Sequence, residues 1–183
     1  MKNLSLRIWV VLAMLALAPG ALIAQTAGQG IMFGTWKLNV DKSDFGAGFK
    51  LMAMTIKVTS DTPELIQFAV DETTGNGFNV SYSFKGAADG KDYPIIGSSS
   101  IYSYTEEPGV VHETQKDTDG TITKGDFTVA EITTPAPKSP TTTKGVKAVV
   151  RPGIKSTVGT WLYTITNPDG SVVKQKLVFD LIP

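Results

Sequence analysis

The chain has 183 residues, of which 42% are hydrophobic, so it can form a folded domain with a buried core. Its 17 basic and 17 acidic residues balance and no cluster of Lys and Arg occurs, which excludes charge-driven binding of nucleic acid. With no cysteine and one histidine, disulfides, thiol catalysis and a conventional zinc site are also excluded.

Residues 1–24 have the pattern of a cleaved secretory signal peptide. Lys2 and Arg7 form a positive start, and an uninterrupted apolar run follows over 8–18. This run is shorter than the ~20 residues that span a bilayer, so we expect cleavage rather than anchoring. Cleavage is expected after Ala24, with Ala27 as an alternative. The sequence therefore predicts a secreted or periplasmic protein that has no lipid anchor and does not span a membrane after cleavage.

The expected mature chain, 25–183, reads as one all-β domain. Apolar residues alternate with polar ones in several runs, as in strands with one buried and one wet face. These runs lie at 52–59, 66–70, 78–85, 161–165 and 173–181. Turn dipeptides such as Asp-Gly and Pro-Gly separate them, and no stretch has a sustained helical period. The pattern predicts an antiparallel up-and-down meander of about eight to ten strands that closes into a small β-barrel.

Residues 133–145 differ from the rest of the chain in composition. They contain three prolines and a run of threonines. Because proline cannot donate a ladder hydrogen bond, we expect an exposed loop or an insertion between two strands. A domain boundary is the alternative, but the roughly 38 residues that follow are too few to bury a core of their own.

Gly34-Thr35-Trp36 stands at the start of the first expected strand. A Gly-x-Trp at this place in an exported meander of this length resembles the lipocalin, or calycin, signature. The wider stretches 34–45 and 89–94 resemble small exported bacterial lipocalin-like proteins. The resemblance implies a small β-barrel whose base is closed by Trp36 beneath a ligand cavity. Trp36 is therefore expected to be structural.

The residues with catalytic or metal-binding potential do not form a recognisable set. His112 and Glu113 are adjacent on an expected strand and so point to opposite faces, which favours a surface or packing role for His112. The stretch 117–120 starts like a calcium loop but lacks the later ligands, and Asp-Gly favours a hairpin turn. We expect no metal site and no cofactor, and the sequence favours a non-enzyme while leaving catalysis open.

Aromatic residues recur on the expected strands. They are Trp36, Phe78, Tyr82, Phe84, Tyr102, Tyr104, Trp161 and Tyr163. They either fill the core or line a cavity in which tyrosine hydroxyls orient a mostly apolar ligand. The expected ligand-binding residues are Tyr82, Phe84, Tyr102 and Tyr163. The sequence thus predicts an exported lipocalin-like binding protein for a small apolar or aromatic ligand. The alternatives are an envelope structural or interaction protein with a filled barrel and, less favoured, a calycin-fold enzyme.

Overall fold

The structure is a computed structural model that describes residues 29–134 and 154–183. The expected signal peptide, 1–24, lies outside these residues. So does most of the expected loop, 135–145.

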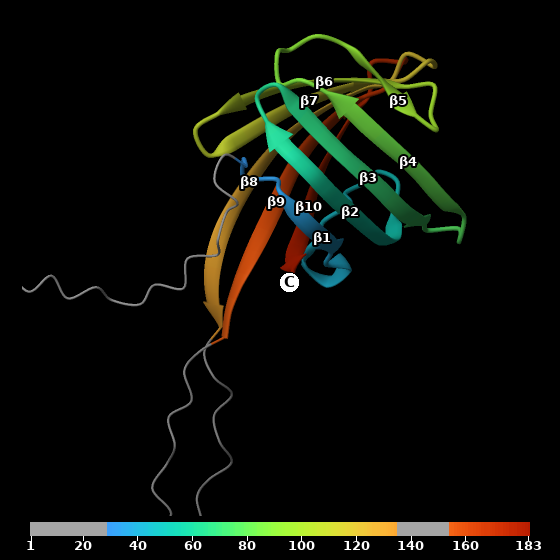
Figure 1. Cartoon of the computed structure of the whole chain (residues 1–183). Coiled ribbons are helices and arrows are strands. Elements are labelled where there is room, and N and C mark those ends of the chain that lie inside the picture. Colours follow the sequence, from blue (N-terminus) through green and yellow to red (C-terminus); the bar gives the residue numbers. More distant parts are fainter. Residues whose placement is uncertain (1–28, 135–153) are drawn as a thin grey trace, which may run out of the picture.

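Ten antiparallel strands form a closed barrel (Figure 1). They are β1 (Gly34–Leu38), β2 (Leu51–Thr62), β3 (Leu65–Thr74), β4 (Asn79–Gly86), β5 (Tyr93–Ile96), β6 (Ile101–Glu107), β7 (Val110–Lys116), β8 (Ile122–Thr134), β9 (Ile154–Thr166) and β10 (Val172–Ile182). One 3-10 helix, η1 (Val40–Lys42), follows β1. Each strand pairs with the next along the chain, and β10 pairs with β1 to close the ring. The predicted all-β antiparallel meander and its closure are confirmed.

Alternation along the strands places apolar side chains inside the barrel. In β3, for example, Ile66, Phe68 and Val70 are buried, whereas Gln67 and Ala69 between them are exposed. This is the behaviour of a sheet with one face on a core and one in water. The core runs through the interior of the barrel and includes most of the aromatic residues.

Two apolar residues, Met52 and Phe78, do not face the interior, although the two-residue alternation of the sequence predicts that they do. Met52 is 60% exposed, because the pairing of β2 with β3 shifts register between Leu51 and Ala53. One extra residue on a strand changes which side chains face the core. Phe78 is 68% exposed and precedes β4 instead of belonging to it.

A short segment before β1 closes one end of the barrel. The side chain of Met32 is 1% exposed and lies in the interior. Its amide donates to Oδ2 of Asp61 at 2.7 Å, and its carbonyl accepts from Nε1 of Trp36 at 2.6 Å. Trp36, itself 1% exposed, therefore holds this segment in place. We call this the closed end.

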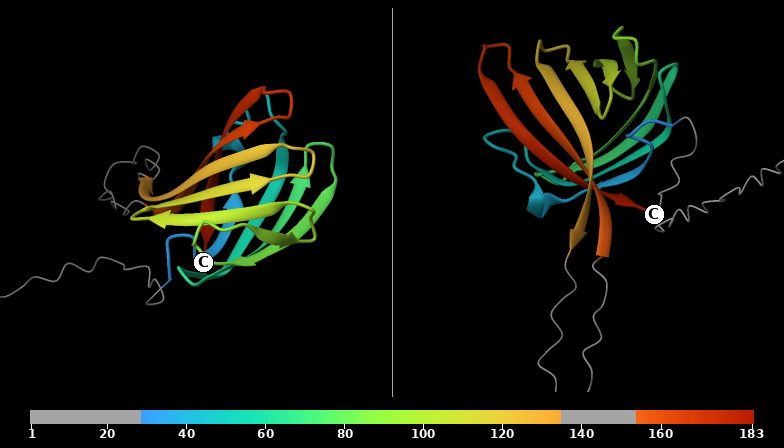
Figure 2. Two further views of the ribbon diagram at one scale, coloured as in Figure 1. Left: turned by 90° about the horizontal axis from the view of Figure 1, so that it is seen from above. Right: turned by 90° about the vertical axis from the view of Figure 1, so that its left-hand side faces the viewer.

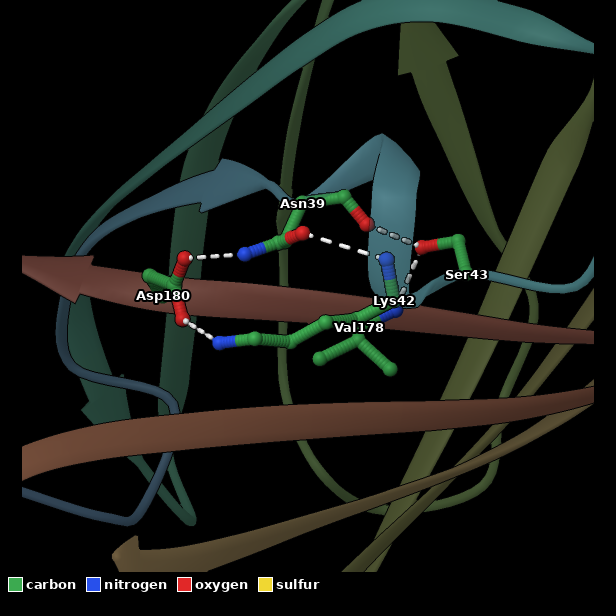
Figure 3. A network of polar contacts seen from close by, with 5 residues as sticks. All are labelled: Asn39, Lys42, Ser43, Val178 and Asp180. Atoms are coloured by element: carbon green, nitrogen blue, oxygen red, sulfur yellow. Dashed lines mark hydrogen bonds and ion pairs between the residues drawn. The ribbon is translucent and has the colours of Figure 1, made fainter. Parts of the chain in front are cut away.

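The opposite end carries the β1–β2 loop, 39–50, and four hairpin turns, and we call it the open end. The loop is tied to β10 by a polar network (Figure 3). Nδ2 of Asn39 donates to Oδ2 of Asp180 at 2.7 Å, and Nζ of Lys42 contacts Oδ1 of the same carboxylate at 3.3 Å. The amide of Val178 donates to Oγ of Ser43 at 2.9 Å. The loop is thus anchored at its start.

Strands β8 and β9 are longer than their neighbours and continue past the barrel (Figures 1 and 2). Their last pairs join Thr133 to Lys155 and Thr134 to Ile154. Thr133 and Thr134 were expected in the loop over 133–145 but form the end of β8. Threonine is β-branched and suits a strand, so composition alone placed this boundary two residues too early.

Candidate functional site

A carboxyl group lies in the middle of the barrel interior. Glu113 stands at the centre of β7 and is 6% exposed. It shares the inward face with Val111, whereas His112 between them faces outward. A charged carboxylate costs several kcal/mol to bury unless it is paired or hydrogen-bonded, so the groups around it decide what this position can do.

A row of residues across four strands surrounds Glu113. Tyr104 on β6 lies directly opposite, and its hydroxyl donates to Oε2 of Glu113 at 3.0 Å. On the other side, Gly125 of β8 pairs with Glu113 and then with Tyr163 of β9. A Cβ at Gly125 would lie 2.5 Å from Cε1 of Tyr163 and 3.0 Å from Cγ of Glu113. The glycine therefore gives the tyrosine ring room beside the carboxyl group.

The environment favours the protonated form of every acid in this cluster. Burial raises the pKa of Glu113, and contacts with the hydroxyls of Tyr163 and Tyr104 and with the indole of Trp161 oppose this shift only in part. Burial, with the charge of Glu113, also raises the pKa of each tyrosine around it, namely Tyr82, Tyr102, Tyr104 and Tyr163. The phenols thus remain hydrogen-bond donors well into alkaline pH.

The structure brings together three of the four expected ligand-binding residues. Tyr82, Tyr102 and Tyr163 line one small space with Glu113. Phe84 does not line it. The Phe84 ring stacks on Phe68 at a centroid distance of 5.2 Å, deeper in the core and 1% exposed.

The space that these side chains enclose has a volume of about 20 Å³. That is room for about one water molecule and not for a whole organic ligand. The aromatic rings thus fill the part of the interior where the sequence suggested a ligand cavity. Trp161 also lines this space, and its Nε1 is buried and makes no hydrogen bond of normal geometry, although the indole lies close enough to Glu113 to lower the pKa of that carboxyl group. An unsatisfied donor of this kind costs ~1–3 kcal/mol, and an oxygen atom in the space would satisfy it.

The cluster can be reached from the open end of the barrel. Tyr82 and Tyr163 are half-buried, unlike the aromatic residues nearer the closed end. Among the next inward positions toward the open end, Ile165 is also half-buried and Val80 is 39% exposed. Glu72 is also half-buried there, and burial raises its pKa. The cluster is therefore least buried on its open-end side, at Tyr82 and Tyr163, and we call this side the mouth.

His112 lies on the outer surface. Its Nδ1 is 2.7 Å from Oδ1 of Asp126, and its Nε2 is 3.9 Å from Oε2 of Glu107. The bond to Asp126 is the main cause that raises the pKa of His112. These two partners do not supply the hydroxyl or thiol nucleophile that a catalytic set with His112 would need. The position of His112 agrees with the expected surface role. The stretch 117–120 forms the β7–β8 turn, where the Gly120 amide donates to the Asp117 carbonyl at 3.0 Å.

Within 29–134 and 154–183, no group of three or more His, Cys, Asp or Glu side chains is placed to hold a metal ion. In the same residues, no helix has the length and hydrophobicity needed to cross a membrane.

Sequence reasoning missed Glu113 and Trp161 as members of the site. Two signals pointed to Glu113: its place on the opposite face from His112, and Gly125 within a neighbouring strand. A glycine inside a strand often marks a close approach of another group. For Trp161 the sequence showed an inward aromatic residue, but not that its indole N–H would lack a partner.

Comparison with known proteins adds no family assignment. No family model matches the chain, and no curated protein matches it. The closed antiparallel barrel is compatible with a lipocalin-like barrel.

Proposed function

We propose that this protein binds a small molecule with an apolar or aromatic body and one oxygen-bearing polar end. The observation that carries the proposal is the polar cluster in the barrel interior: a buried carboxyl group that accepts from the Tyr104 hydroxyl, three further tyrosines that line the same space, and the Trp161 indole N–H, which makes no hydrogen bond of normal geometry. The pattern of residues 1–24 and the motif Gly34-Thr35-Trp36 support an exported, lipocalin-like binding protein.

A barrel with a purely structural core has no need of this cluster. Replacing buried ionisable groups with well-packed apolar residues is often neutral or stabilising. The costs of burying Glu113 and of leaving Trp161 Nε1 unsatisfied are therefore unexplained by folding alone. Local features that oppose stability are expected where a protein binds or reacts.

The volume of the central space determines how such a ligand would lie. About 20 Å³ accommodates a single oxygen-bearing group but not the rest of a molecule. In our proposal the polar end enters this space and accepts from Nε1 of Trp161. The apolar body rests in the mouth on the half-buried rings of Tyr82 and Tyr163. Stacking and desolvation supply affinity, and the hydrogen bond supplies selectivity.

A matched pair of probes tests this arrangement. Binding of 2-naphthol and of naphthalene is measured by titration calorimetry with the parent protein and with Trp161→Phe, which keeps a ring but removes the N–H donor. We expect 2-naphthol to bind the parent about tenfold more tightly than naphthalene, the value of one good hydrogen bond, and to lose this advantage in the variant. Native mass spectrometry of protein purified from its own source would identify the natural ligand. Equal binding of the two probes to the parent contradicts the proposed polar contact.

A structural role with a filled barrel is the second candidate, and the small central volume favours it. In that case native mass spectra should show no ligand, and 2-naphthol should bind the parent no more tightly than naphthalene. Stability does not separate the two candidates, because Glu113→Leu replaces a buried acid with an apolar side chain of similar size and should stabilise the protein in either case.

A further inference from the structure

A pair of acidic side chains occupies the closed end of the barrel, apart from the Glu113 cluster. Asp61, near the end of β2, is 0% exposed, and Glu106, near the end of β6, is half-buried. Both lie at the same end of the interior, and after burial Asp61 is the neighbour that raises the pKa of Glu106, so the two carboxyl groups lie close together. Oδ1 of Asp61 and Oε1 of Glu106 are both buried, and neither accepts a hydrogen bond from any N–H or O–H of the described chain.

One proton shared between the two carboxyl groups gives both of these unpaired oxygens a hydrogen bond. Two ionised carboxylates in buried contact repel each other, so one of them takes up a proton. The protonated group then donates to the ionised one, and this charge-assisted bond replaces the missing partners.

The same carboxylate holds the segment that closes the barrel. Oδ2 of Asp61 accepts from the amide of Met32 at 2.7 Å. The backbone amide of Asp61 donates to Oε1 of Gln29 at 2.7 Å, and its carbonyl accepts from the amide of Gly30 at 2.5 Å. Met32 in turn accepts from the Trp36 indole. The position of Asp61 therefore decides whether residues 29–32 stay against the barrel.

We propose that Asp61 and Glu106 share one proton and that this proton locks the segment 29–32 over the closed end. Loss of the proton leaves two negative charges in contact. The repulsion displaces the Asp61 carboxylate from the Met32 amide and loosens the segment.

Other charged groups of the described chain do not compete for this role. Across the strands, Asp61 lies opposite Ile66 and Glu106 opposite Val111, both of which are apolar. The segment 29–32 brings Gln29 but no ionisable side chain, and Glu64 in the β2–β3 turn is exposed. On the outer face, Glu107 contacts His112. The adjoining 87–92 loop carries Asp89, Lys91 and Asp92, which pair with each other or with Lys116.

The proton is released in the physiological range. Burial, followed by the contact with Asp61, raises the pKa of Glu106 to about 7 from its ordinary value of 4.5. A group whose pKa is raised on folding stabilises the folded state at low pH, and this stabilisation is lost as the pH rises through the folded value. The lock should thus hold in mildly acidic medium and weaken on the alkaline side of neutrality.

Nitrogen-15 NMR of the protein tests the proposal at the two bonds concerned. The signals of the Met32 amide and of the Trp36 indole N–H are followed from mildly acidic to mildly alkaline pH. We expect both to shift with one common midpoint near 7. In Glu106→Gln they should stay at their acid-side positions throughout, because the amide NH₂ donates to Asp61 at any pH. The control Glu107→Gln, which removes the neighbouring exposed carboxylate, should titrate like the parent.

Two outcomes would overturn the shared proton. The first is the absence of any common midpoint in the parent, and the second is an unchanged midpoint in Glu106→Gln. If Glu106→Gln does not fold, the carboxyl carbon signal of Glu106 in the parent tests the same point, because its midpoint should coincide with that of the Met32 amide and the Trp36 indole.

Discussion

Trp36 is the residue whose substitution should most weaken the closed end. Its ring packs edge-on against Phe127 at 5.4 Å, and its indole holds the carbonyl of Met32. Trp36→Ala should cost ~3–5 kcal/mol of unfolding free energy, because a large buried ring is removed. Urea denaturation measures this cost. The control Phe78→Ala, at a residue that is 68% exposed, should change the free energy of unfolding by less than ~0.5 kcal/mol. A Trp36→Ala midpoint equal to the parent's would show that the ring is not needed.

Gly125 controls the geometry of the candidate site. Gly125→Ala should destabilise the protein by ~1–3 kcal/mol, because the new Cβ meets the Tyr163 ring and Glu113. A double-mutant cycle with Tyr163→Leu isolates the cause, since the cost of the alanine should fall when the ring is gone. Equal costs in both backgrounds would place the strain elsewhere. Circular dichroism with urea titration provides the four free energies.

At the scale of elements, the β1–β2 loop should depend more on Ser43 than on its ion pair. Oγ of Ser43 accepts from the amide of Val178, which lies on β10. Ser43→Ala leaves that strand amide unsatisfied and should cost ~1–2 kcal/mol. Lys42 and Asp180 are about half exposed, with side-chain exposures of 50% and 42%, so Lys42→Ala should cost ~0–0.5 kcal/mol. Thermal unfolding of the two variants ranks them, and a larger loss for Lys42→Ala would reverse the interpretation.

The elements show where sequence reasoning stops. The alternation in β3 needs only local information, because each residue's face follows from its parity. The face of Met52 depends on a register shift against another strand, and no local pattern encodes that partner. Likewise, the end of β8 at Thr134 depends on pairing with Ile154, a residue beyond the intervening prolines. Strand partners that are distant in sequence thus decide which face Met52 takes and where β8 ends.

Prediction of the candidate site from sequence meets the same limit, because contacts between strands decide its shape. Tyr82, Tyr102 and Tyr163 were predicted to face inward because strand parity suffices for that. Whether they enclose a ligand-sized space depends on how rings from different strands fit together, and the structure leaves about 20 Å³. Phe84 faces inward too, but its stacking on Phe68 moves it out of the site. Inward direction is readable from sequence, whereas packing is not.

For the whole molecule, we expect maximal stability in mildly acidic medium. Folding raises the pKa of three glutamates above 4.5 and that of His112 above 6.5, so the stabilisation they give is lost as the pH rises through the raised values. The glutamates are Glu72, Glu106 and Glu113. Three exposed aspartates have pKa values lowered below 3.8 by local hydrogen bonds, and their stabilisation is lost at lower pH. They are Asp89, Asp119 and Asp169.

The urea midpoint measured across pH tests this expectation. It should peak between the two groups of pKa values, at about pH 4–5, and decline toward neutrality and beyond. In Glu113→Gln the decline above the peak should be shallower, because one of the acids responsible is gone. A midpoint that rises from mildly acidic to neutral pH would contradict the combined effect of these groups.

The pairing of β10 with β1 has a consequence for how the chain acquires its fold. Thr35 meets Ile182, and Leu38 meets Phe179, so contacts that close the barrel join the beginning of the described chain to its end. During synthesis, β1 has no neighbour on that side until the final strand has been made. Closure of so long a loop is entropically costly and slow, which makes the barrel a late product of folding. Until then β1 and β9 each present an unpaired edge to other chains, so the interval before closure is when this protein is most prone to aggregate.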